Sequence, residues 1–369
     1  MLVQCVRRHS YLAIALFLAF GASIHAQTKY LYVTNETTSN ISVYSVDRTT
    51  GQLYTAGTIT TASMPHWIQF SPSGAFAYVV SDDGITASLA TYAVNSATGG
   101  LTQTSSLFLK PATFPTPKVT PLGSYLVLTD GRNDQVNTYS LNQTTGAPTQ
   151  ASTSTSLNTP WSVAFGSNLY AYVVGNGNEL TPFFINQTIG STTASTPMLV
   201  RSLTASRSFK SPHAQMATVH PNGNVLYVTD PIGGTLSSFS INSLGALTAL
   251  GSPVATGVNS SDTVVDSGGK FLYTGDWGSG RIAGFSLDSN GVPTAMAGSP
   301  FPTPLITPSQ RGGGVAIAID SSGQFLYATS SESNQITGFR IDRTSGALSQ
   351  IPGLLLSTGG NPFRVVAAP

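Results

Sequence analysis

A motif that recurs along the whole chain constrains its fold more than any other feature of the sequence. In its clearest form an apolar strand follows a turn glycine, as in Gly323-Gln324-Phe325-Leu326-Tyr327. Successive copies are 45 to 55 residues apart, and their last positions are Tyr32, Tyr78, Val127, Tyr172, Tyr227, Tyr273 and Tyr327. A period of about 40 to 50 residues, with strands and no helical pattern, is typical of a β-propeller.

A second marker supports the same division of the chain. A later turn in each repeat carries a glycine, at Gly51, Gly99, Gly146, Gly190, Gly245, Gly291 and Gly346. The two series agree on which repeats are long, and the turn glycines supply the positive φ angles that tight hairpins need. The sequence therefore predicts an all-β fold, a seven-bladed β-propeller whose blades are four-stranded and antiparallel.

The two ends of the chain complement each other. The final stretch contains Pro362-Phe363-Arg364-Val365, which reads like the start of an innermost strand such as Pro65-His66-Trp67-Ile68. The N-terminal repeat lacks that strand. We therefore expect the N- and C-terminal strands to pair within one blade, which closes the ring and leaves no exposed sheet edge.

The first 26 residues are predicted to be a secretory signal peptide rather than part of the propeller. Arg7 and Arg8 form a basic start, Tyr11–Phe20 is an apolar run, and Ala26 ends a stretch of small residues. A transmembrane anchor would need about 20 apolar residues, so the run is short for one. We expect residues 27–369 to form one domain that is exported to the periplasm or the extracellular space.

Composition narrows the classes of function. The single cysteine, Cys5, lies in the predicted signal peptide, so the mature chain has no disulfide or thiol nucleophile. Without Arg7 and Arg8 it has 14 Lys and Arg against 15 Asp and Glu, which disfavours nucleic-acid binding. We expect a monomer with no cofactor and no membrane span after signal removal. Its histidines lack zinc-ligand spacing, so no metal site is predicted.

The two longest repeats are predicted to carry insertions between the last strand of one blade and the first strand of the next, at about residues 191–211 and 298–313. Such connections emerge at one mouth of the central channel. The basic residues of the two insertions are Arg201, Arg207, Lys210 and Arg311. Together they favour an anionic or polyhydroxylated ligand, although ordinary solvated loop charges fit the same pattern.

Three histidines and three aspartates stand at defined positions of the repeat. His66 and His213 open innermost strands, where a site role and a structural role are equally open, whereas His220 lies beside a turn at the far end and is predicted to be structural. The aspartates end the second strand of their blades, and their recurrence indicates a repeated structural hydrogen bond to a neighbouring loop; they are Asp130, Asp230 and Asp276.

The repeat phrases resemble those of a known family. The chain carries Tyr-Val-Thr-Asn at residues 32–35, Val46-Asp47 followed by Gly51 and Leu53, and Pro221-Asn222-Gly223-Asn224-Val225-Leu226-Tyr227. Over the whole mature chain this is similar to the seven-bladed lactonase family, which includes propeller-type 6-phosphogluconolactonases and carboxymuconate-cyclising enzymes. The resemblance implies a propeller fold and a lactone substrate.

The family's motifs are matched in part. Active members carry Pro-His-x-His at the opening of blade 5, with an arginine shortly before it; here the corresponding residues are His213, Gln215 and Arg207. Where the family has Pro-Arg-His and Asn-Glu in the next blade, this chain has Ser260-Ser261-Asp262 and Asp276-Trp277. The resemblance therefore implies a site at these positions with altered residues.

Lactone opening needs a base to activate water and a donor for the oxyanion. We predict His213 and Asp262 as catalytic acid and base groups. The predicted substrate-binding residues are His66, Arg207, Gln215, Asp276, Arg311 and Arg364.

Two functions stay open at this point. The first is an exported hydrolase of a sugar or organic-acid lactone, whose substrate differs from a cytoplasmic sugar-phosphate lactone. The second is a non-catalytic propeller that binds glycan, cell-surface material or a protein partner, as the Tyr-Val-Thr-Asn repeats of surface-layer propellers suggest.

Overall fold

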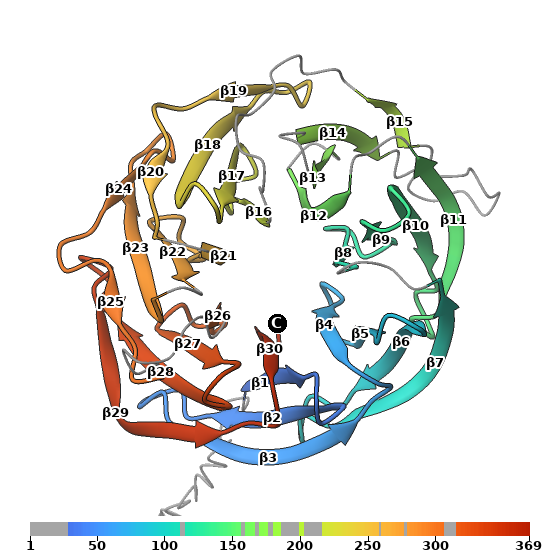
Figure 1. The fold of residues 1–369 in the computed structure, drawn as a ribbon, viewed down its shortest axis with the longest axis horizontal. Coiled ribbons are helices and arrows are strands. Elements are labelled where there is room, and N and C mark those ends of the chain that lie inside the picture. Colours follow the sequence, from blue (N-terminus) through green and yellow to red (C-terminus); the bar gives the residue numbers. More distant parts are fainter. Residues whose placement is uncertain are drawn as a thin grey trace, which may run out of the picture.

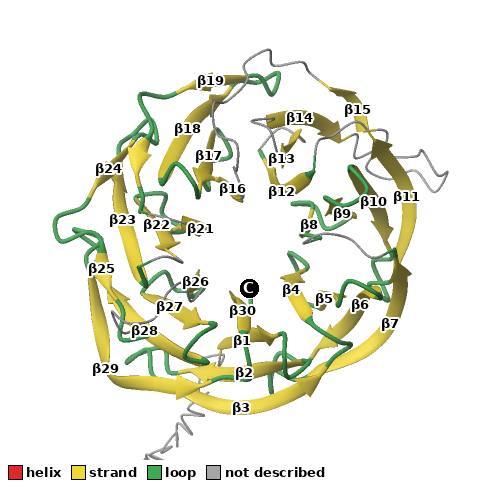
Figure 2. Cartoon of the chain, viewed as in Figure 1, coloured by secondary structure: helices red, strands yellow, loops and turns green. Residues whose placement is uncertain are grey.

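The computed structural model describes residues 29–110, 115–155, 159–166, 170–175, 180–185, 199–202, 216–257, 260–276, 279–305 and 315–369. Within these residues every regular element is a β-strand, and the strands form seven antiparallel sheets. The sheets stand around a common axis like the blades of a propeller, and the region about this axis, bordered by the innermost strands, is called the channel below (Figures 1 and 2). The predicted all-β, seven-bladed fold is confirmed.

Each blade has four strand positions, A to D, from the channel outward. The A strands of blades 1 to 7 are β30 (Pro362–Ala367), β4 (Pro65–Phe70), β8 (Pro117–Val119), β12 (Pro160–Phe165), β16 (Met216–Val219), β21 (Ser260–Val265) and β26 (Val315–Ile319). The B strands are β1 (Lys29–Asn35), β5 (Phe76–Asp82), β9 (Tyr125–Asp130), β13 (Tyr170–Gly175), β17 (Val225–Asp230), β22 (Phe271–Asp276) and β27 (Phe325–Ser330).

The outer two positions are more varied. The C strands are β2 (Asn40–Val46), β6 (Ala87–Val94), β10 (Gln135–Leu141), β14 (Leu180–Ile185), β18 (Thr235–Ile241), β23 (Arg281–Leu287) and β28 (Gln335–Ile341). The D position holds β3 (Leu53–Thr60), β7 (Leu101–Leu109), β11 (Pro148–Thr155), β15 (Leu199–Ser202), β19 (Leu247–Ala249) with β20 (Val254–Ala255), β24 (Pro293–Ala295) with β25 (Phe301–Pro302), and β29 (Leu348–Ser357).

Blade 1 closes the ring with strands from both ends of the chain. β30 pairs antiparallel with β1, and the register sets Arg364 opposite Thr34 and Val365 opposite Val33. In Figure 1 the red β30 lies beside the blue β1, next to the channel. The predicted closure is confirmed, and it leaves no unpaired edge at the join between first and last blades.

The insertions are placed differently from the prediction. We expected residues 191–211 and 298–313 to connect strand D to strand A, but β15 pairs with β14 and β25 pairs with β23, so part of each segment belongs to the outermost strand. Arg201 therefore lies on β15 at the rim of the propeller, and its expected position at the channel mouth is wrong. In blade 4 strand D begins only at Leu199, and in blade 6 it consists of β24 and β25.

The two sequence markers contact each other in the fold. Tyr327 of blade 7 donates a hydrogen bond from its hydroxyl to the Gly51 carbonyl of blade 1, at 2.8 Å. Blades 1, 4, 5 and 6 make the same bond to the following blade, through Tyr32 to Gly99, Tyr172 to Gly245, Tyr227 to Gly291 and Tyr273 to Gly346. In these five cases the two series keep the same spacing because each tyrosine binds the turn glycine of the following blade.

Packing explains why the turn residue is glycine. Gly51 has φ 78°, and a Cβ on it would lie 2.4 Å from the ring of Phe325 in the neighbouring blade. A side chain there would be strained and would also collide with the core. The apolar core consists of such contacts between adjacent blades; one cluster joins Leu31 and Tyr44 of blade 1 to Phe325 and Ile336 of blade 7.

Candidate functional site

The A strands share an irregularity that shapes the channel. In β4, β12, β21 and β30 the register with strand B shifts at the second residue of the strand, as a β-bulge does. A bulge bends the strand and redirects the side chains that follow it. The third residues of these strands are Trp67, Ser162, Asp262 and Arg364.

These third residues belong to one layer of the channel. The last residue of the recurring motif, such as Tyr32 or Tyr273, lies on strand B. Each layer residue pairs with the residue two positions after it, as Arg364 pairs with Thr34 and Asp262 with Gly275. The full layer, in the order of blades 1 to 7, is Arg364, Trp67, Thr116, Ser162, Met216, Asp262 and Ala316. Residues far apart in the sequence are therefore at one height around the axis.

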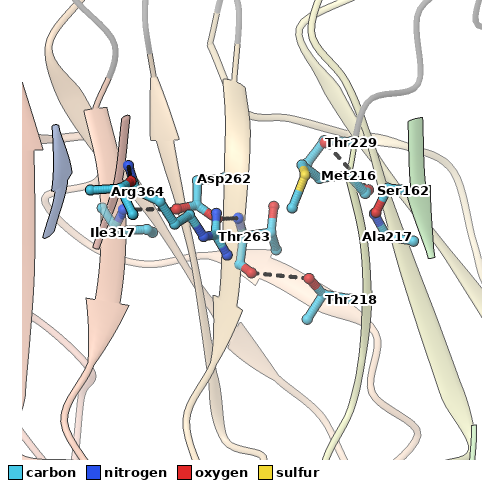
Figure 3. Close-up of polar contacts among 10 residues, drawn as sticks. Ser162, Met216, Ala217, Thr218, Thr229, Asp262, Thr263, Ile317 and Arg364 are labelled. Carbon is cyan, nitrogen blue, oxygen red and sulfur yellow. Dashed lines mark hydrogen bonds and ion pairs between the residues drawn. The ribbon is translucent and has the colours of Figure 1, made fainter. Parts of the chain in front are cut away.

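An ion pair crosses this layer. Arg364 Nη1 of blade 1 lies 2.5 Å from Asp262 Oδ1 of blade 6, so the pair spans the A strand of blade 7. The Asp262 carboxylate is 3% exposed and accepts two further hydrogen bonds, from Thr263 N at 3.0 Å and from Ile317 N at 2.9 Å (Figure 3). Three donors thus fix the carboxylate that holds the guanidinium.

An aromatic ring holds the guanidinium from another side. The central carbon of the Arg364 guanidinium lies 4.6 Å from the centroid of the Trp67 ring, which is a cation–π distance. The Trp67 ring in turn packs edge-on against Phe363, with centroids 5.9 Å apart. A guanidinium has five N–H donors, and among the described residues Arg364 uses its side chain for one hydrogen bond, to Asp262. Its other donors have no partner among the described residues.

Lys118 on β8 adds a second cation to the channel. Its side chain is half-buried, and in the described part of the chain its ammonium has no hydrogen bond and no ion pair. Burial lowers the pKa of Lys118 to about 8; the charge of Arg364 acts in the same direction, and that of Asp262 opposes it. Lys118 is therefore electrostatically coupled to the Arg364–Asp262 pair.

Hydrogen bonds between neighbouring A strands support these side chains. Thr218 Oγ1 donates to Thr263 O at 3.0 Å, and Ala217 N donates to Ser162 Oγ at 3.1 Å (Figure 3). On the opposite side of the ring, Thr34 Oγ1 accepts from Arg364 N and donates to His66 O, both at 3.1 Å. Such side-chain-to-backbone bonds hold the layer in register between blades.

His66 lies at the seam between blades 1 and 2. Its Nε2 is 3.1 Å from Glu36 Oε1, its ring stacks on Phe363, and both His66 and Glu36 are buried. Asn361 Nδ2 donates a hydrogen bond to the other Glu36 oxygen. Burial raises the pKa of Glu36 to about 7; it lowers the pKa of His66, with Asp82 opposing that change.

The recurrent aspartates bind their own loops. Asp276 accepts hydrogen bonds from Ser279 N and Ser279 Oγ, at 3.3 and 2.6 Å, and is 4% exposed. The other two bind equivalent loop residues, Asp130 through Asn133 and Asp230 through Ile232 and Gly233. The predicted repeated bond is confirmed.

The far-end histidine also has the structural role that the sequence predicts. His220 Nε2 lies 2.9 Å from the Gly269 carbonyl of the next blade, and His220 Nδ1 accepts from Asn222 N at 3.1 Å. The ring thus joins blades 5 and 6 at the turns between strands A and B.

The structure describes half of the predicted site residues. It brings Asp262 and Arg364 together, and it places His66 and Asp276 in separate local networks. His213, Arg207, Gln215 and Arg311, together with the predicted signal peptide at 1–26, lie outside the described residues. In the portion that is described, no three His, Cys, Asp or Glu side chains are grouped as metal ligands, and no helix is long and apolar enough to cross a membrane.

Sequence reasoning missed Lys118, Trp67 and Glu36. A usable signal was present for Lys118: once the repeats are aligned, the described A strands carry only four ionisable residues of the Asp, Glu, His, Lys and Arg types. These are His66, Lys118, Asp262 and Arg364.

Comparison with known families identifies a match over most of the chain. The model of the family described as "Lactonase, 7-bladed beta-propeller" matches residues 22–165 and 200–298. No protein of curated function matches the sequence.

Solved structures share the fold at low identity. A candidate 6-phosphogluconolactonase from Bacteroides fragilis is 18% identical, with a TM-score of 0.77 over 94% of this chain and 99% of the other. A second candidate 6-phosphogluconolactonase, from Bacteroides uniformis, is 18% identical with a TM-score of 0.75, covering 92% and 99% of the two chains. The periplasmic gluconolactonase of Pseudomonas aeruginosa is 17% identical, with a TM-score of 0.73 over 92% of this chain and 99% of that one.

Proposed function

The chain belongs to the seven-bladed β-propeller lactonase family, and from this premise we propose that it hydrolyses a lactone in the central channel. The observation that carries the proposal is the Arg364–Asp262 pair, set against Trp67 in one layer of the channel. A cation beside an aromatic face, with further donors that no described residue engages, suits a polar ring that develops negative charge on its carbonyl oxygen.

The chemistry assigns a role to each of these residues. Water adds to the lactone carbonyl carbon, the bond between that carbon and the ring oxygen breaks, and a hydroxy acid results. Arg364 donates to the carbonyl oxygen as it becomes an oxyanion, and Trp67 packs against the ring of the substrate. Asp262 is a positioning residue, because its carboxylate is already bound by three donors and orients Arg364.

The proposed substrate class is a sugar lactone or organic-acid lactone, and the proposed location is the periplasm or the extracellular space. The predicted signal peptide and the Pseudomonas aeruginosa relative, a periplasmic gluconolactonase by name, both support this choice. His213 remains the acid or base group predicted from the sequence.

The test is acid release by residues 27–369 from a panel of aldono-, uronic and muconic lactones. We expect turnover above buffer on at least one of them, and Arg364→Gln should lower kcat about 100-fold, since removal of one oxyanion donor typically costs that much. Arg340→Gln is the matched control, because Arg340 is an exposed arginine on β28 that bonds the Thr49 carbonyl. A folded protein with no turnover on any lactone would contradict the proposal and favour a propeller that only binds.

A further inference from the structure

The ionisable residues of the A strands differ in their freedom to exchange a proton. Arg364 donates to Asp262 and lies against the ring of Trp67. Asp262 accepts hydrogen bonds from Arg364, Thr263 and Ile317. His66 is buried at the seam and lies against Glu36. Lys118 is the remaining one, half-buried beside the channel and without a hydrogen bond or ion pair among the described residues.

We propose that the neutral amine of Lys118 is the general base that activates water for lactone opening. This inference rests on the proposed function, because it assigns the proton transfer of that same reaction. It is carried by the position of Lys118 on an innermost strand, by its nitrogen, which has no hydrogen-bond or ion-pair partner among the described residues, and by its electrostatic coupling to Arg364, the residue that would hold the carbonyl oxygen.

The surroundings of Lys118 favour its neutral form. Burial and the charge of Arg364 lower its pKa to about 8, although Asp262 acts in the opposite direction. A lysine beside another cation in a desolvated site is a recognised way to obtain a reactive amine near neutral pH. A general base works best when its pKa is close to the operating pH.

Among the described strands, no other element that packs on β8 supplies a competing charge at this point. β12 has no ionisable residue, and β4 contributes only His66, which Glu36 engages. β9 carries Tyr125 and Asp130 at its two ends, and Asp130 is bound by Asn133 in the loop. β8 itself carries only Lys118, so Arg364 and Asp262 are the charges that act on its amine.

The step balances without a co-reactant. Lys118 Nζ accepts a proton from water while the water oxygen bonds to the carbonyl carbon, and the π electrons move to the oxygen held by Arg364. When the tetrahedral species collapses, the bond to the ring oxygen breaks and the protonated Lys118 returns its proton to the leaving alkoxide. One water and one lactone give one hydroxy acid.

The experiment compares kcat between pH 6 and 10 for the protein and for Lys118→Met, Lys118→Arg, Lys118→Ala and His213→Ala. In the unaltered protein kcat should rise through about pH 8 and level off. Lys118→Met should lower kcat at least 100-fold, and Lys118→Arg should fail as well because an arginine does not release its proton. Added methylamine should restore part of the turnover of Lys118→Ala, with a pH profile that follows the added amine.

Controls separate this inference from the function on which it rests. Lys270→Met removes an exposed lysine from the turn between β21 and β22 and should leave kcat unchanged. Urea unfolding of each Lys118 variant checks the fold, and the amine rescue needs only that Lys118→Ala folds. Turnover by the unaltered protein combined with near-normal turnover by Lys118→Met or Lys118→Arg would overturn the base assignment alone. No lactone turnover at all would overturn the proposed function, and the base assignment with it.

Discussion

Arg364 Nη1 and Asp262 Oδ1 are 2.5 Å apart although the residues are 102 positions apart in the sequence, and the pair bridges blades 1 and 6 across β26. The same carboxylate accepts a hydrogen bond from Ile317 N on β26. One side chain therefore fixes the A strands of three consecutive blades, including the blade that closes the ring. Positioning of the candidate oxyanion donor and ring closure are thus coupled.

Asp262→Asn should weaken both the positioning of Arg364 and the closure of the ring. The substitution leaves Arg364 without its counter-charge and sets an amide group, in place of the carboxylate, against the backbone N–H donors of Thr263 and Ile317. We therefore expect a loss of about 3 kcal/mol in the free energy of unfolding and a fall in kcat of about 10- to 100-fold. Urea unfolding and lactone turnover measure the two effects. Asp288→Asn, in an exposed turn where the amide oxygen can still accept from Asn290 N and Val292 N, is the control. Equal behaviour of the two variants would remove Asp262 from the site.

Trp67 should act on binding more than on stability. Trp67→Leu removes the ring face that lies 4.6 Å from the Arg364 guanidinium, whereas Trp67→Phe keeps an aromatic face of smaller area. We expect Trp67→Leu to raise KM about 5- to 30-fold, the equivalent of about 1 to 2 kcal/mol for a partly desolvated cation–π contact, and Trp67→Phe to recover most of it. An unchanged KM in Trp67→Leu would mean that the ring does not meet the substrate.

Much of the fold could be predicted because the repeat markers are themselves contacts. Tyr327 and Gly51 recur at fixed spacing since one donates to the other across a blade boundary, so periodicity in the sequence records the geometry of the ring. The pairing of β30 with β1 was predicted from the likeness of residues 362–365 to the start of another innermost strand. The outermost strands were harder to place, because β15 and β25 are short, lie at the rim and carry no repeated contact of this kind.

The site could be predicted only in part. Asp262 was named from the family resemblance and Arg364 as a candidate donor on the closing strand, but the sequence could not show that they meet, because the distance depends on the stacking of three blades. Lys118 was missed since its chemistry comes from burial and from the neighbouring Arg364, and neither is visible in a local motif. Asp276 accepts a hydrogen bond from Ser279 in its own loop, and its role as a substrate-binding residue stays a prediction.

Tyr327→Phe should test the contact that links the repeats. The hydroxyl that the substitution removes is fully buried and donates a hydrogen bond to the Gly51 carbonyl. In the variant this carbonyl loses that donor. A buried carbonyl that loses its donor costs about 1 to 2 kcal/mol, so the urea midpoint should fall by the corresponding amount. Tyr54→Phe is the matched control, because Tyr54 is 59% exposed on β3. A midpoint shift of the same size in both variants would mean that the inter-blade bond contributes nothing specific.

The Glu36–His66 pair at the ring-closing seam should make stability depend on pH. Burial raises the pKa of Glu36 from 4.5 to about 7, so the folded state holds this proton more tightly than the unfolded chain does. The associated stability is fully present below about pH 4.5 and is lost as the pH rises to about 7. The pKa of His66 is lowered from 6.5, so the stability linked to its neutral form is present above that pH and is lost as the pH falls through its folded-state pKa.

Glu36→Gln separates the two contributions. The amide carries no charge to bury, so at pH 8 the variant should unfold at a higher urea concentration than the unaltered protein. Its free energy of unfolding should be larger by about 1 to 3 kcal/mol, the equivalent of a shift of about two pKa units. At pH 5, where Glu36 is largely protonated in the folded state, the two should differ little. Asp288→Asn, again the exposed-carboxylate control, should give the same small difference at both pH values. A Glu36→Gln variant that is less stable than the unaltered protein at pH 8 would mean that the ionised Glu36 is a net stabilising partner of His66 and Asn361.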